Sequence, residues 1–466
     1  MNKKIITIIL AAFLVGAFSF ANEKLDADLA YLKRVLAEAY AGYEYNVEQG
    51  FDFDEAIENV RGRYLEKASD AGIGENDISD DLLAECINSE ILQKLKVADN
   101  HFQIISKKSA YGFIQSIWYS SNVYFKKQGE DYYVAFSLNP KIRRKAKFTG
   151  KPENLFKVIL FNKEYYVFGI QSDKKIKKTE ISINNKTYLT KIRVGNFLKK
   201  HEAAHVGMKK TKKSIYFSFS DCTLNGYDRT SHTLISRKVQ DYLLELKKNR
   251  YENIIVDLRG NFGGWVQNIT PVLETANFEG DYKNLIEVNK KINTFRSSRI
   301  VDSDLTKEAV KRLNTENPAY YNFTVEDSTT EYYKKNPVTE YDFKPAFKGN
   351  IIIISDFNSA SASELFIAFS YIFENVYLIG TNTSGTIDFG SLLDYYLPES
   401  GVRLHLASES YKDSDFLQKN PHWHGDTKGF YPDYWCTDNS LLPTLVAITK
   451  DKKLKRKLRG LKKHLL

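Results

Sequence analysis

Cysteine, proline and glycine are all scarce in this chain. Its 466 residues include three Cys, ten Pro and 25 Gly. Cys86, Cys222 and Cys436 lie far apart, so they lack the spacing of a metal site and could form at most one disulfide bond, whose partners the sequence does not identify. The low Pro and Gly content excludes a fibrous or a disordered chain. With 42% hydrophobic and 27% charged residues, the composition is that of an ordinary globular protein.

Apolar runs of membrane-spanning length are absent after the N-terminus. The one long run, Ile5 to Phe20, follows two lysines, and Ser19 and Ala21 supply the small residues of a cleavage site. This pattern predicts a secretory signal peptide over residues 1–21, with an uncleaved membrane anchor as the alternative. We therefore expect the mature protein to be periplasmic or secreted.

A net positive charge is absent from the body of the chain, although the formal net charge of the whole sequence is +9. Residues 450–466 hold nine Lys or Arg and one Asp, and the leader adds two lysines, so the remainder is close to neutral. We therefore expect no nucleic-acid partner. In the tail, Leu454, Leu458, Leu461 and Leu465 fall on one helical face. This favours a terminal helix docked on the domain, or else a basic amphipathic helix in weak contact with a membrane surface.

The residue pattern of the sequence changes three times after the leader. Residues 22–102 repeat apolar side chains every three or four positions and predict an N-terminal helical domain. Residues 103–213 contain short β-type runs and predict a β-rich domain, in which no PDZ-type loop is recognisable. Residues 214–447 alternate strands and helices, interrupted by a polar insertion at about 280–347, and a basic helix or tail follows at 448–466. The predicted fold class is α/β, or α+β overall.

Two turns rich in Gly and Ser are the candidates for chemistry. Asp-Leu-Arg-Gly-Asn-Phe-Gly-Gly at residues 257–264 follows an apolar strand, and its paired glycines let backbone N–H groups approach a ligand, as in an oxyanion hole. Ser-Ala-Ser-Ala-Ser-Glu at residues 359–364 lies between a strand and a helix, where the helix dipole favours a developing negative charge. The alternatives are a tight structural turn for the first, and for the second a plain N-cap with a capping box between Ser361 and Glu364.

Taken together, the two turns resemble those of the tail-specific (C-terminal-processing) serine proteases and the related tricorn core proteases. The resemblance covers about residues 214–440 and includes a Gly-x-x-Thr-x-Gly turn at 380–385 and Gly-Phe-Tyr-Pro-Asp at 429–433. It implies a crotonase-like ββα core and a serine peptidase that cleaves peptide or protein substrates through an acyl-enzyme, with no metal or cofactor.

By the same resemblance, Ser361 is the nucleophile. The backbone N–H groups of Ala362 and of Gly263 or Gly264 would hold the oxyanion.

A lysine is absent where the tail-specific branch has its catalytic base. The matching position is Thr386, and no Lys occurs between Ser361 and Tyr411. This excludes the usual Ser-Lys dyad and favours a histidine base. By resemblance to the tricorn-like branch, His101 would be that base, and Asp426, three residues before Gly429, would orient it. Three other histidines remain candidates for the base: His405, His422 and His424.

Two other functions stay open. The missing lysine also fits a catalytically inactive relative that binds a peptide or an apolar ligand. The segment His201-Glu202-Ala203-Ala204-His205 is a literal His-Glu-x-x-His, which on a helix would bind zinc in a metallopeptidase. Flanking lysines, weak apolar periodicity and the lack of a third His at the extended spacing argue against this third function.

Overall fold

The structure is a computed structural model that describes most of the chain after the leader. The described residues are 22–74, 77–194, 206–224, 234–280, 283–284, 299–301, 303–316, 344–436 and 438–458. The predicted signal peptide, the His201 to His205 motif and most of the predicted insertion lie outside them. Among the described helices, none is long and apolar enough to cross a membrane.

The described residues form two compact units. The first unit comprises residues up to Phe113 together with Arg299–Tyr332 and Phe389–Ser410, and the second comprises the rest. The mixture of helices and sheets confirms the predicted α/β class. The division itself is organised differently from the predicted domains, because residues 389–410, expected within the core domain, pack in the first unit.

The first unit combines helices with a small antiparallel sheet. Its helices are α2 (Glu23–Ala39), α3 (Tyr43–Glu48), α4 (Phe53–Asp70), α5 (Asp80–Glu90), the 3-10 turn η1 (Leu92–Lys94) and α9 (Asp304–Glu316). Its strands are β1 (Gln103–Ile105), β2 (Ala110–Tyr111), β12 (Arg299–Ile300), β15 (Phe389–Tyr396) and β16 (Arg403–Ser410). They run in the order β12-β16-β1-β2, with β15 also paired to β16.

Side-chain caps fix where α2, α4 and α5 begin. The side chains of Asn22, Asp52 and Ser79 each accept a hydrogen bond from the backbone N–H three residues later. The apolar faces of α2, α4 and α5 then pack in one cluster with Leu404 and Leu406 of β16. Part of the core of this helical unit therefore comes from strands near the end of the chain.

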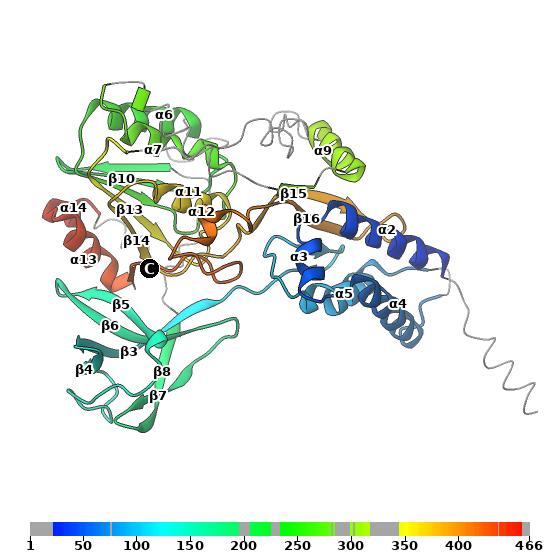
Figure 1. Ribbon diagram of the computed structural model, residues 1–466, viewed down its shortest axis with the longest axis horizontal. Helices are drawn as coiled ribbons and strands as arrows, with labels where there is room; N and C mark the ends of the chain where they lie inside the picture. Colours follow the sequence, from blue (N-terminus) through cyan, green and yellow to red (C-terminus); the bar gives the residue numbers. More distant parts are fainter. Residues whose placement is uncertain are drawn as a thin grey trace, which may run out of the picture. The chain divides into compact units, whose positions relative to one another are not determined.

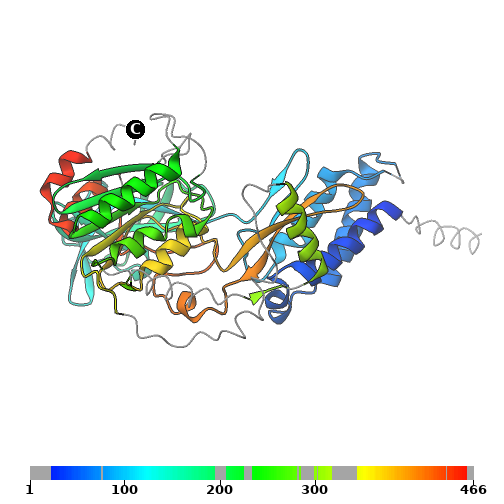
Figure 2. The ribbon, with the colours of Figure 1, turned by 90° about the horizontal axis from the view of Figure 1, so that it is seen from above.

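The second unit contains the core sheet of the protein, with helices on both faces (Figures 1 and 2). The strands run in the order β17-β14-β13-β11-β10-β9 and are parallel except for β9. They are β9 (Val206–Lys210), β10 (Ser214–Phe219), β11 (Asn253–Asp257), β13 (Asn350–Ser355), β14 (Val376–Gly380) and β17 (Tyr434–Trp435). The helices are α6 (Ile235–Lys248), η3 (Val266–Asn268), α7 (Pro271–Ala276), α11 (Ala362–Ser370), α12 (Asp415–Gln418), α13 (Asp438–Thr449) and α14 (Lys452–Lys457).

Alternation along β11 explains why both faces of this sheet are covered. Ile254 and Val256 pack with α6, α7 and α11, whereas Ile255 packs on the opposite side with α13 and α14. All five residues of β11 are buried, as expected for a parallel strand between two helical layers. The two turns at residues 257–264 and 359–364 follow β11 and β13, so they leave the sheet at its carboxyl end.

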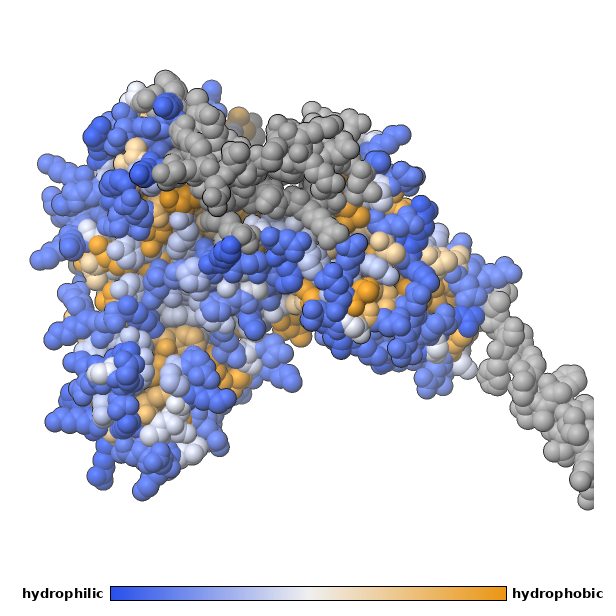
Figure 3. Space-filling model, in the orientation of Figure 1, coloured by the Kyte–Doolittle hydropathy of each residue, from blue (hydrophilic) through white to orange (hydrophobic). Residues whose placement is uncertain are grey.

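A second sheet in the same unit is antiparallel. Its order is β5-β6-β3-β8-β7, with β4 on β3. The strands are β3 (Ile117–Gln128), β4 (Asp131–Ser137), β5 (Leu155–Leu160), β6 (Lys163–Ser172), β7 (Lys178–Ile183) and β8 (Lys186–Val194), and the 3-10 turn η2 (Pro152–Asn154) precedes β5. Hydrophilic residues cover most of the described surface in Figure 3, with apolar residues scattered among them.

Candidate active site

The Gly turn and the Ser turn are joined directly at the end of the core sheet. β11 and β13 are parallel neighbours, so the segments that follow them leave the sheet at the same edge. The Ser359 hydroxyl donates to the carbonyl of Leu258 at 2.8 Å, and the N–H of Ala360 donates to the carbonyl of Asn261 at 3.0 Å. The hydroxyl of Ser363 also donates to the Asn261 carbonyl, at 3.1 Å. Two motifs about a hundred residues apart in sequence thus form one structure, at the edge where open α/β sheets bind ligands.

Buried carboxyl groups shape both turns. Asp257 accepts two hydrogen bonds from the Arg259 guanidinium, at 2.8 and 2.6 Å, and one from the Tyr216 hydroxyl. Burial opposes ionisation of Asp257, but the charge and hydrogen bonds of Arg259 outweigh it and lower the pKa of this carboxyl. Asp356 accepts from the N–H of Gly260 at 3.0 Å, and burial raises its pKa to about 6. The sequence analysis did not predict Asp356. Its position directly after a buried strand is the pattern that could have indicated it.

Ser361 has a backbone conformation that a plain helix cap does not need. It is the N-cap of α11, with φ 52° and ψ −117°. An N-cap residue ordinarily has β-region angles, and a non-glycine residue at positive φ stores strain of about 1–3 kcal/mol. Its N–H donates to Glu364 Oε2 at 3.1 Å, so the capping interaction expected as an alternative also forms. The strained turn between strand and helix is nevertheless the geometry that presents a nucleophilic serine.

The glycine pair allows the first turn to approach Ser361 closely. Gly263 and Gly264 have φ of 103° and 122°. A Cβ on Gly263 would lie 2.8 Å from Cβ of Ser361 and 3.1 Å from the nitrogen of Ala362, so a larger residue would collide there. The N–H of Gly263 is engaged, because it donates to Asn261 Oδ1 at 2.9 Å. Among the hydrogen bonds of the described residues, none uses the N–H of Gly264 or that of Ala362.

Glu364 ties the Ser361 turn to the turn that follows β14. Its buried carboxyl accepts from the N–H of Ser361, from those of Gly385 and Thr386 at 2.8 Å each, and from the hydroxyl of Thr383. Burial raises the pKa of Glu364 to about 7, although these hydrogen bonds act to lower it. Because the N–H groups of Thr386 and Ser361 share Oε2 of this carboxyl, the position that lacks the expected lysine lies beside Ser361.

Asp426 is buried against the residues that follow Thr386. Its Oδ1 accepts from the N–H groups of Ile387 and Asp388, at 3.0 Å each. Asp388 is itself buried and accepts from the indole N–H of Trp423 at 3.0 Å. Asp426 therefore holds the main chain of this segment in place. Its spacing from Gly429 in the sequence could not reveal this role.

His101 is a buried histidine of the first unit, whereas Ser361 and Asp426 belong to the second. Its Nδ1 lies 2.8 Å from the carbonyl oxygen of Phe389. Since a carbonyl only accepts, Nδ1 carries the proton and Nε2 keeps its lone pair. Burial lowers the pKa of His101 to about 4, so the ring is neutral over the ordinary pH range.

The other candidate histidines have partners of their own. His405, in the first unit, contacts Asp394 Oδ1 through Nδ1 at 2.7 Å. His422 Nδ1 lies 2.9 Å from the carbonyl of Tyr431. The ring of His424 stacks on that of Tyr431, with centroids 3.6 Å apart, and burial lowers its pKa.

The part of the chain that the structure describes contains neither a disulfide bond nor a metal-binding cluster. All three cysteines are buried and free. No group of three or more His, Cys, Asp or Glu in the described ranges could hold a metal ion. The His-Glu-x-x-His motif at 201–205 lies outside those ranges, so it stays a prediction from sequence.

A family model matches the central part of the chain. Residues 225–434 match the family model of Peptidase family S41, a stretch that holds both turns and Asp426 but not His101. No curated protein matches the chain.

Solved structures give weaker likenesses. The chain is similar to mature CPAF (TM-score 0.42, 11% identity, covering 96% of this chain and 98% of that one). It is also similar to the photosystem II D1 C-terminal processing protease (TM-score 0.36, 12% identity, 92% and 96%). A third likeness is to the tricorn protease (TM-score 0.34, 13% identity, 92% and 37%). At TM-scores this low, the three likenesses add nothing about function.

Proposed function

We propose that this chain is an exported serine peptidase that cleaves peptide bonds through an acyl-enzyme on Ser361. The match of residues 225–434 to peptidase family S41 supports a peptidase. The observation that carries the serine mechanism is the positive-φ turn of Ser361 at the start of α11, in contact with the Gly263 turn. Export rests on the predicted signal peptide at residues 1–21.

The backbone donors beside Ser361 suit an oxyanion hole. Ser361 Oγ attacks the substrate carbonyl carbon, and the negative oxygen accepts from the N–H groups of Ala362 and Gly264, which are unengaged among the described residues. Gly263 would join them only if its N–H left Asn261 Oδ1. Loss of one such donor typically lowers kcat by about 10²- to 10³-fold.

His101 is the base that we propose. Its Nε2 takes the proton of Ser361 and gives it to the leaving amine, after which water hydrolyses the ester. The carbonyl of Phe389 fixes the tautomer that this step needs. Asp426 binds the two N–H groups just before Phe389 in the chain, so we infer that it orients His101 through this main-chain segment.

Replacing the nucleophile tests the proposal. Ser361→Ala should abolish cleavage of a fluorogenic peptide and labelling by a fluorophosphonate probe, while thermal unfolding stays cooperative. Ser370→Ala, at the far end of the same helix, is the matched control and should keep both properties. Unchanged turnover in Ser361→Ala would refute the serine mechanism, and full activity after exhaustive chelation would dispose of the zinc alternative.

Thr386 keeps a second candidate function open. Because this residue replaces the expected lysine beside Ser361, the chain could instead be an inactive relative that binds a peptide or an apolar ligand. Folded wild-type protein that neither cleaves peptides nor reacts with the fluorophosphonate probe would favour this candidate.

A further inference from the structure

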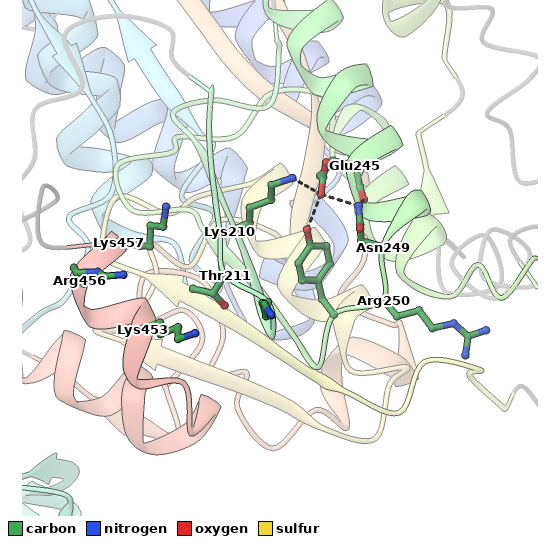
Figure 4. A pocket seen from close by; sticks show the side chains of 10 residues that line it. Lys210, Thr211, Glu245, Asn249, Arg250, Lys453, Arg456 and Lys457 are labelled. Atoms are coloured by element: carbon green, nitrogen blue, oxygen red, sulfur yellow. Dashed lines mark hydrogen bonds and ion pairs between the residues drawn. The ribbon is translucent and has the colours of Figure 1, made fainter.

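A basic groove lies in the second unit between β9, the end of α6 and α14, and none of the residues proposed for catalysis lines it (Figure 4). Its volume is about 660 Å³. The lining residues are Lys210, Thr211, Lys212, Glu245, Asn249, Arg250, Tyr251, Lys453, Arg456 and Lys457. Six of these ten side chains are cationic and one is acidic, so the groove carries an excess of positive charge.

The one carboxylate among the ten described lining residues already has partners. Glu245 pairs with Lys210 Nζ at 2.7 Å and accepts from the Tyr251 hydroxyl at 2.7 Å and the Asn249 amide at 2.8 Å. The hydrogen bond and charge of Lys210 lower the pKa of Glu245, so this pair is ionised and self-contained.

Within the part of the chain that the structure describes, the remaining cations of the groove have no carboxylate partner. Among the ion pairs of the described residues, none uses Lys212, Arg250, Lys453, Arg456 or Lys457. In Figure 4, Lys453 and Arg456 extend from α14 toward Thr211, whereas Arg250 extends away from that helix. Like charges held around a hollow without counter-charges repel one another, and a bound anion would relieve that repulsion.

The apolar face of α14 is buried in the protein core. Leu454 and Leu458 are almost fully buried beside Ile352 and Ile354 of β13. Asp451 caps the helix through the N–H of Lys453. The helix therefore has no free apolar face in its described part with which to enter a lipid surface, and its cations are held in place.

Asp451 also fixes α14 to the strands that border the groove. Its Oδ2 accepts from the hydroxyl of Ser214 at 2.9 Å and from that of Thr211. The cations of α14 are thus presented from a docked helix.

We propose that this groove binds a soluble ligand that carries two or more clustered phosphate groups. Its volume falls within the range of small-molecule sites, about 300–1,000 Å³. Lysine ammonium groups bind phosphate as point charges, and several unpaired cations favour a multiply charged ligand over a single carboxylate. Among the ten described lining residues, Tyr251 is the only aromatic one, and it bonds to Glu245, so these residues offer no open stacking platform for nucleic-acid bases.

Binding of inorganic tripolyphosphate to the full chain tests the proposal. Titration calorimetry should detect binding that weakens as the salt concentration rises above about 0.1 M. Lys453→Gln/Lys457→Gln should weaken it at least about tenfold. Lys452→Gln/Lys455→Gln removes the same charge from exposed positions of the same helix outside the groove, and should change the affinity less than about twofold.

Three results would overturn the proposal. The first is no binding of tripolyphosphate by wild-type protein. The second is equal weakening by the two double variants, because this indicates a diffuse charge effect. The third is binding to vesicles of anionic lipid that the groove variant abolishes while its affinity for tripolyphosphate stays that of wild type. Ser361→Ala should bind tripolyphosphate like wild type, because the groove and the proposed active site share no residue. A failure of the groove proposal would therefore not count against the proposed peptidase function.

Discussion

At the scale of single residues, the buried ring of His101 sets a pH limit for the proposed chemistry. The neutral imidazole is the form that accepts a proton, and burial lowers the pKa of His101 to about 4. If His101 is the base, kcat/KM should stay high down to about pH 5 and fall only as the pH approaches 4. An unperturbed histidine would give this fall near pH 6.5. A pH profile of kcat/KM with a fluorogenic peptide measures the difference.

Unfolding must be measured beside this profile. The folded-state pKa of His101 is depressed, so its contribution to stability is full above about pH 6.5 and is lost as the pH falls toward 4. His101→Gln should lower kcat about 10²- to 10⁴-fold, whereas His405→Gln and His422→Gln should keep most of the activity. An acid limb near pH 6.5 that persists in His101→Gln would contradict the assignment.

At the scale of secondary-structure elements, Glu364 links the start of α11 to the turn after β14. Its folded-state pKa of about 7 lies above the ordinary 4.5. The protonated carboxyl therefore contributes stability that is full below about pH 4.5 and is lost as the pH rises through 7, on the order of 3 kcal/mol. Glu364→Gln should be less stable than wild type at pH 5 by about 1–3 kcal/mol, because its amide NH₂ faces backbone donors. This difference should shrink or reverse at pH 8.

Urea unfolding of the two proteins at pH 5 and pH 8 checks this expectation. Subtracting wild type from variant removes the contributions of other titrating groups. Glu374→Gln, at an exposed position, is the control and should give a difference that does not change with pH. A difference for Glu364→Gln that is equally constant would show that Glu364 titrates normally.

The same elements show what the sequence could and could not predict about the site. Ser361 and Gly263 stand in turns between apolar strands and helices, so local pattern made these two turns candidates, and the resemblance to a protease family then singled out the residues within them. The sequence could not show that Asn261 takes the N–H of Gly263, or that Glu364 reaches Thr386 as well as Ser361. These contacts span at most 22 residues of the chain, but they depend on how the turns fold in three dimensions and leave no periodicity to read.

At the scale of the whole molecule, the same limit applies to the first unit. Periodicity predicted its helices between residues 22 and 102, and α2, α4 and α5 lie there. It also suggested a self-contained helical domain, but β1 pairs with β16, and Gln103 lies opposite His405 in that pairing. Strand pairing over some 300 residues depends on tertiary packing, for which the sequence of either strand gives no partner.

The segment 389–410 should therefore be indispensable to the first unit. Six of its apolar side chains are at most 5% exposed in the same cluster as α2 and α5: Leu393, Tyr395, Leu397, Val402, Leu404 and Leu406. At roughly 1.5–3 kcal/mol each, their burial contributes about 9–18 kcal/mol, which is as large as the whole stability of a typical domain. Buried Asp28 also accepts from the N–H groups of Glu399 and Ser400, at 2.7 and 3.0 Å.

A fragment of residues 22–113 should consequently lack a cooperative thermal transition by circular dichroism and should bind a hydrophobic dye. The same fragment joined by a flexible linker to residues 389–410 should regain the transition, because the added strands cover the apolar faces and satisfy Asp28. A linked fragment with Leu404→Asp is the matched control and should not regain it, since an unpaired carboxylate would then be buried in the cluster. Cooperative melting of the short fragment by itself would mean that the helices suffice, and that β15 and β16 only dock on a domain already folded.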